Sequence, residues 1–94
     1  MIKPQDFVIV QNKRKIGWCD FNKKKIIVQI EKREITILED ISKEIWDLCQ
    51  KPTSISDIMK YLKERFPEVK PAVIRRDTSI FLKDLIKKKL LVLV

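Results

Sequence analysis

In the first forty positions of the chain, short apolar segments alternate with polar breaks, a pattern typical of β-strands. The breaks contain no glycine, so Asn, Lys and Arg must form the turns. Alternation puts Ile26, Val28 and Ile30 on one face of a strand, and Ile35 and Ile37 on one face of the next. The pattern predicts an N-terminal antiparallel β-meander. Its strands are expected at residues 7–10, 15–21, 26–30 and 34–38.

Beyond Leu38 the apolar residues repeat at steps of three and four, which predicts helices. Asp40 stands where it can cap the first helix, and Ser54 with Asp57 forms a capping box at the start of the second. Pro71 suits the first turn of the third helix, where its missing N–H does no harm. The predicted helices span residues 41–50, 54–66 and 71–89.

The apolar stripes of these helices supply a core. We expect Trp46, Phe81 and Leu85 to be buried, and the apolar residues 90–94 to pack against the body of the domain. A chain of 94 residues suits one domain, because two would each be too small for a stable core. The sequence therefore predicts a single α+β domain over residues 1–94, with the meander first and three α-helices after it.

The composition limits the chemistry that such a domain can carry. Without histidine there is no ordinary catalytic triad and no imidazole base, and Cys19 and Cys49 are too few ligands for a closed zinc site. We therefore expect no catalytic residue, no metal and no cofactor. We expect both thiols to be buried and reduced rather than joined in a disulfide. No apolar run has the length of a membrane span and no signal peptide is recognised, which predicts a cytoplasmic protein.

The net charge of +8 is compatible with more than one kind of partner. It favours a polyanion or an acidic peptide, but lysines spread along the chain also suit a surface that is merely soluble. Steps of three and four align four residues on the third helix, and these either bind a partner or form the solvated face of an amphipathic helix. They are Arg76, Ile80, Lys83 and Lys87.

From the end of the fourth strand onward, motifs occur in the order and spacing of a known family. They are Leu38-Glu39, Ile45-Trp46-Asp47-Leu48, Ser54-Ile55-Ser56-Asp57-Ile58, Asp77-Thr78-Ser79-Ile80-Phe81-Leu82-Lys83-Asp84-Leu85 and Lys89-Leu90-Leu91. In this arrangement the chain resembles the PqqD-like family, also called RiPP recognition elements. It departs from the family at Glu39, where Asn is usual, and at Lys89, where Gly is usual.

The resemblance implies a winged-helix-like domain that binds without catalysing. Members of this family capture the leader segment of a ribosomally synthesised precursor peptide by β-strand addition, and present it to a peptide-modifying enzyme. The expected partners are therefore a leader peptide and that enzyme, and neither a membrane nor a nucleic acid. The residues expected to bind the leader are Glu34, Ile35, Thr36, Ile37 and Leu38 on the strand, and Arg76, Ile80, Lys83 and Lys87 on the helix.

Two other functions remain open from the sequence alone. A winged-helix DNA-binding protein would place Arg75 and Arg76 of its third helix on phosphates or base edges. Against this, the same helix carries Asp77 and Asp84, and few residues follow it to form a C-terminal hairpin wing. The other function is that of a structural subunit of a larger enzyme, which would co-purify with that enzyme and show no affinity for a peptide.

Overall fold

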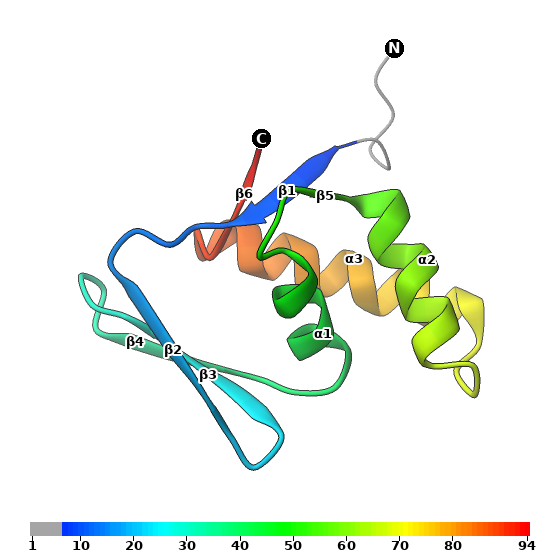
Figure 1. Ribbon diagram of the computed structural model, residues 1–94, viewed down its shortest axis with the longest axis horizontal. Coiled ribbons are helices and arrows are strands. Elements are labelled where there is room, and N and C mark those ends of the chain that lie inside the picture. Colours follow the sequence, from blue (N-terminus) through cyan, green and yellow to red (C-terminus); the bar gives the residue numbers. More distant parts are fainter. Residues whose placement is uncertain (1–6) are drawn as a thin grey trace.

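The computed structural model describes residues 7–94, which form two small antiparallel sheets and three helices (Figure 1). The elements are β1 (Val8–Gln11), β2 (Ile16–Phe21), β3 (Lys24–Gln29), β4 (Glu34–Leu38), α1 (Ile41–Leu48), β5 (Thr53–Ser54), α2 (Ile55–Arg65), α3 (Pro71–Lys87) and β6 (Leu91–Leu93). The molecule is flat, measuring 36 × 35 × 19 Å. The fold is α+β, as predicted, and each helix begins and ends within two residues of its expected position.

The first strand does not belong to the meander, and this part of the prediction was wrong. β1 pairs with β5 on one side and β6 on the other, so that Ile9 lies opposite both Thr53 and Leu93. The physical reason is burial, because this arrangement encloses Ile9 completely. Residues 90–94 do pack against the domain, as expected, and they do so by forming β6 beside β1 (Figure 1).

The remaining meander has the strand order β2-β3-β4. Asn22 and Lys23 join β2 to β3 with φ of 51° and 62°, the left-handed pair that a two-residue hairpin turn requires. Ile27 and Leu38 point inward to the helices. The predicted shared faces are confirmed by the register, and they form the outer side of the sheet. The apolar residues of this outer side are Ile26, Val28, Ile35 and Ile37, with Ile30 exposed just beyond β3.

Of the two N-caps predicted for α1 and α2, one is confirmed and the other prediction was wrong. Ser54 Oγ accepts a hydrogen bond from the Asp57 N–H at 3.1 Å and so caps α2. At α1, within the described residues, the Asp40 side chain makes no capping bond. Its φ of 51° departs from the extended conformation that an N-cap needs. Ser42 Oγ bonds instead to Glu39, accepting from its N–H at 3.1 Å and donating to its carbonyl at 2.8 Å.

The third helix begins at Pro71, as predicted, and ends in a left-handed turn at Lys89. Lys89 has a φ of 61°, and its N–H donates to the Ile86 carbonyl at 3.0 Å. The Leu90 N–H donates to the Leu85 carbonyl at 2.9 Å, which completes a Schellman motif. A lysine thus occupies the position where glycine is least strained.

The core lies between the three helices and both sheets, and it includes Ile27 and Leu38 from one sheet and Ile9 and Leu91 from the other. Trp46 and Leu85 are buried, as predicted, with exposed fractions of 0% and 1%. Phe81 was expected to be buried, but it lies at the edge of the core and is half-buried. Cys49 is buried, whereas Cys19 is exposed, because its position on β2 faces outward beside Ile26. Within residues 7–94, none of the helices combines the length and apolar character needed to cross a bilayer.

Candidate functional site

The outer edge of β4 is open. In the sheet order β2-β3-β4, β4 pairs with β3 along one edge, and no other strand among residues 7–94 pairs with its second edge. Ile35 and Ile37 are 67% and 55% exposed, while the side chains of Thr36 and Leu38 point into the core. An edge of this kind presents unpaired N–H and C=O groups on which an extended peptide can form a further strand.

A hollow with an apolar floor and an acidic rim lies at the C-terminal end of this edge. Ile37 and Phe81 contribute to its floor from β4 and α3, and Asp77 stands on its rim one helical turn before Phe81. The same hollow is lined from the β4–α1 connection by Glu39, Asp40, Ile41 and Ser42. The half-burial of Phe81 follows from this position, because one side of its ring faces the hollow. The hollow can therefore take a side chain of a peptide that lies along β4.

Hydrogen bonds at the other end of α3 hold the helix beside the sheet. The Gln29 side chain at the end of β3 is buried, and its Nε2 donates to the Lys88 carbonyl at 2.8 Å. Lys32 Nζ donates to the same carbonyl at 3.2 Å. These bonds satisfy a carbonyl that the helix leaves free at its C-terminus. They also hold the C-terminal end of α3 against the end of β3.

A buried lysine attaches the sheet to α1. The Lys25 side chain is 6% exposed, and its Nζ lies 2.9 Å from Asp20 Oδ1 and 3.2 Å from Asp47 Oδ1. Burial lowers the pKa of Lys25, but its hydrogen bonds to the two carboxylates outweigh this effect and raise the pKa above its ordinary value. The hydrogen bond from Lys25 lowers the pKa of Asp20. Lys25 therefore stays charged and holds β3 against α1.

The predicted helix residues do not all lie on the β4 side of α3. Ile80 is 55% exposed and directly precedes Phe81, and Lys87 is exposed in the last turn. Arg76 is exposed, with its Nε 3.3 Å from Asp77 Oδ1. Lys83 lines a separate hollow on the α2 side of the helix. The roles of these residues in peptide binding stay predictions, and the structure separates Lys83 from the hollow at the end of β4.

Sequence reasoning missed Asp77 and Phe81 as site residues. Their four-residue spacing places them on one face of α3, which was the available signal. Phe81 was assigned to the core, since a phenylalanine on an apolar stripe is most often buried. Among residues 7–94, the structure contains no group of three or more Cys, Asp or Glu side chains placed to hold a metal ion.

Comparisons with known proteins identify the family and the fold. The model of the family described as "Coenzyme PQQ synthesis protein D (PqqD)" matches residues 24–91, a span that includes both β4 and α3. Among solved structures, "TbiB1 in Complex with the TbiA(beta) Leader Peptide" is similar in fold. Its TM-score is 0.74 at 17% sequence identity, covering 87% of this chain and 94% of the other. A comparison with curated protein sequences gives no significant match. Because the family model spans well over half of the sequence, the chain belongs to the PqqD family.

Proposed function

We propose that this protein is a non-catalytic binding module that captures the leader segment of a ribosomally synthesised precursor peptide. The leader adds as a strand along Glu34–Leu38, and the module presents the bound precursor to a partner modifying enzyme. The observation that carries the proposal is the open edge of β4 beside the hollow floored by Ile37 and Phe81. The cytoplasm, where such a precursor is synthesised, is the compartment in which we place this function.

The similar solved structure supports the proposal, since it is described as a complex with a leader peptide. Backbone pairing along β4 tolerates many sequences, so specificity must come from side chains around the strand. The hollow at Phe81 provides an apolar contact, and the exposed Ile80 provides a second. Arg76 and Lys87 offer charges on the same helix. Lys83 is the weakest member of the proposed set, because it lines the hollow on the other side of α3.

The test titrates a synthetic leader segment, taken from the precursor on which the partner enzyme acts, against the full chain. We expect saturable binding and amide chemical-shift changes along β4 and the facing side of α3. N-methylation of alternate leader residues should weaken binding, because each methyl group removes a donor from the added strand. Shift changes elsewhere, with β4 unaffected, would contradict strand addition at this edge. Preferential binding of mixed-sequence duplex DNA would favour the winged-helix DNA-binding function instead.

Phe81→Ala gives a sharper test of the hollow. We expect leader affinity to fall by about tenfold, or ~1.4 kcal/mol, because the floor of the hollow is lost. The free energy of unfolding should fall by only about 2 kcal/mol, less than the ~3–5 typical of a fully buried phenylalanine. The matched control is Phe21→Ala, since Phe21 is 63% exposed at the end of β2. Equal leader affinities for the two variants would show that the leader does not use the hollow.

A further inference from the structure

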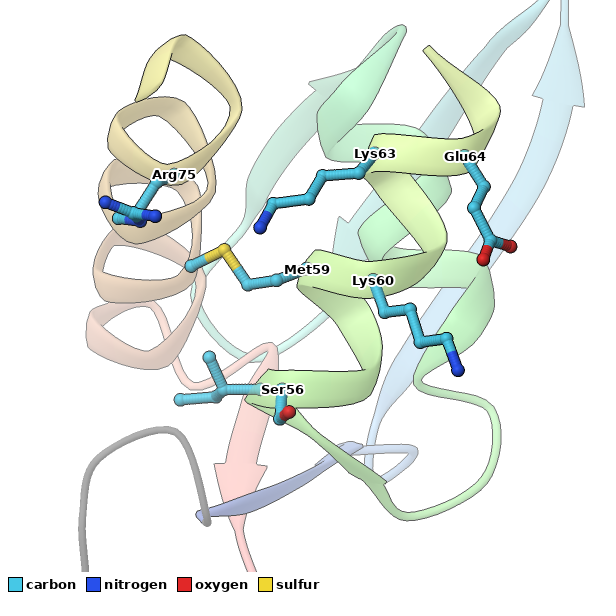
Figure 2. A pocket seen from close by; sticks show the side chains of 7 residues that line it. Ser56, Met59, Lys60, Lys63, Glu64 and Arg75 are labelled. Atoms are coloured by element: carbon cyan, nitrogen blue, oxygen red, sulfur yellow. The ribbon is translucent and has the colours of Figure 1, made fainter. Parts of the chain in front are cut away.

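A second groove lies on the opposite flank of α3, between α2 and α3. Two hollows, of about 640 and 440 Å³, make it up, and they are continuous because Ile55, Met59 and Arg75 line both. Figure 2 shows Met59 reaching from α2 toward α3 across the first hollow. The second hollow continues toward the sheet of β1 and β6, where Phe7 and Leu93 line it. We call this surface the α2–α3 groove.

The floor of the α2–α3 groove is apolar. Met59 and Ile55 contribute from α2, and Leu82 and Ile86 from α3. Phe7 and Leu93 are exposed there, at 39% and 53% of their surfaces. Exposed apolar side chains gathered in a concave surface are typical of a site that another chain covers.

The rim of the α2–α3 groove is basic, and its cations form no salt bridge with a carboxylate of residues 7–94. Lys63 reaches from α2 toward α3, and Arg75 lies across α3, while Lys60 and Glu64 point outward from α2 (Figure 2). Lys83 lines the groove farther along α3. Glu64 is the one carboxylate among the lining residues of the two hollows. Among residues 7–94, no salt bridge involves any of these four cations, whereas Arg65 next to them is paired with Glu44.

We propose that the α2–α3 groove docks an acidic amphipathic helix of a protein partner. The apolar face of such a helix covers Met59 and its neighbours, and its carboxylates meet Lys63, Arg75 and Lys83, a helix-in-groove arrangement. The charge complementarity selects an acidic segment. A second copy of this chain would bring a net charge of +8 and an equally basic groove. The apolar floor disfavours nucleic acid, whose phosphates require no such surface.

The proposed function enters this inference only through the identity of the partner. If the protein binds a leader peptide, the partner that docks in the α2–α3 groove is the modifying enzyme. The leader and the enzyme segment occupy opposite flanks of α3, so both bind at once. Binding of the enzyme segment and binding of the leader are therefore tested in separate experiments. If one of the two ligands does not bind, the result for the other can still be interpreted.

The probe is a synthetic amphipathic peptide of about 16 residues, long enough to form a helix when bound. It carries Leu at helical spacing on one face and Glu on the other. A matched peptide has Lys in place of every Glu, and a second matched peptide has the same composition with the Leu spacing scrambled. Each is titrated into the ¹⁵N-labelled full chain. We expect only the acidic amphipathic peptide to bind saturably, with shift changes at Met59, Lys63 and Arg75 and none along β4.

The decisive variant is Lys63→Glu/Arg75→Glu. We expect it to weaken binding of the acidic peptide by about tenfold, since two rim charges are reversed. The matched control, Lys13→Glu/Lys51→Glu, makes the same change in net charge at exposed positions outside the groove, and should change the affinity less than twofold. Both variants should keep the melting temperature and the leader affinity of the wild type. Lys63→Arg/Arg75→Lys, which keeps both charges, should bind the acidic peptide like the wild type.

Three results would overturn the proposal. Equal weakening by the groove and control reversals would show that net charge alone attracts the peptide. Shift changes along β4 would show that the acidic peptide enters the leader site. Tighter binding at the same residues by mixed-sequence duplex DNA, or by vesicles containing phosphatidylserine, would assign the groove to a nucleic acid or a membrane.

Discussion

The two flanks of α3 differ in how their charges are balanced. Asp77, on the flank toward β4, lies 3.3 Å from Arg76, and Asp84 lies 3.1 Å from Lys88 farther along the helix. On the α2 flank, the cations of the α2–α3 groove form no salt bridge with any residue from 7 to 94. The two flanks are therefore suited to different kinds of ligand. The β4 flank offers the unpaired backbone groups of β4 and the hollow at Phe81, whereas the α2 flank offers an apolar floor and cations that pair with no carboxylate of residues 7–94.

The substitution expected to destabilise both flanks of α3 most is Leu85→Ala. Leu85 is 1% exposed on the buried face of α3, between the two flanks, and its carbonyl belongs to the Schellman motif. We expect the free energy of unfolding to fall by about 3 kcal/mol, through lost burial and the cavity left behind. Urea denaturation measures this effect. Ile30→Ala, at a 65% exposed position, is the control and should cost less than ~0.5 kcal/mol.

Alkaline pH should lower the free energy of unfolding of the whole domain, because it acts on the core that both flanks of α3 share. Burial raises the pKa of the Cys49 thiol to about 11, from a value of 9.0 in the unfolded chain. Above pH 9 the unfolded state loses this proton and the folded state keeps it, so stability falls as pH rises. Between pH 9 and 10.5 the free energy of unfolding should fall by about 1.5 kcal/mol.

The measurement for Cys49 is urea denaturation at a series of pH values, compared with Cys49→Ala. The variant starts from a lower stability because it loses packing, but it should lack this part of the alkaline slope. The Cys19 thiol is present in both proteins and cancels. Parallel slopes for the two proteins would show that Cys49 is not protected from ionisation.

Single charge reversals test ligand binding on the two flanks of α3 separately. Lys87→Glu should weaken binding of an acidic leader about fivefold, or ~1 kcal/mol, through lost charge pairing. Lys83→Glu should change leader affinity less than twofold and weaken binding of the acidic amphipathic peptide more strongly, since Lys83 lines the α2–α3 groove. Both residues are exposed, so the melting temperature should stay constant. Isothermal titration of both ligands against both variants makes the comparison, and a reversed pattern would exchange the two assignments.

The smallest expected effect concerns the end of α3. Lys89→Gly should raise the free energy of unfolding by about 0.5–1 kcal/mol, because glycine adopts the observed φ of 61° without strain. Lys89→Ala is the control and should not stabilise the protein. Neither variant should change binding on either flank, so a loss of leader affinity would mean that Lys89 belongs to the site.

The fold was predictable wherever the chain pairs with its near neighbours. The helix ends and the β2-β3-β4 meander follow from local spacing and caps, as Ser54 and Pro71 illustrate. β1 was placed wrongly because its partners, Thr53 and Leu93, are far away in the sequence, and alternation carries no information about which strand lies beside which.

The site was predictable in outline only. An open edge on the last strand of a meander follows from topology, and the basic residues of α3 were visible from their spacing. Helical periodicity does not tell which neighbour each flank of a helix meets, so it gave no sign that Lys83 lines the hollow between α2 and α3. Gln29 and Lys25 gave no signal either, because polar residues on a strand are usually exposed.

The pairing of β1 with β6 has a consequence for synthesis on the ribosome. Ile9 is made early, but its partner Leu93 is made about eighty residues later. At typical translation rates of about 5–20 residues per second, β1 waits roughly 4–16 s for that neighbour. The β2-β3-β4 hairpins can form meanwhile from adjacent segments. β5 can pair with one edge of β1 earlier, but the other edge of β1 stays open until β6 is made, and an open apolar edge is prone to aggregation.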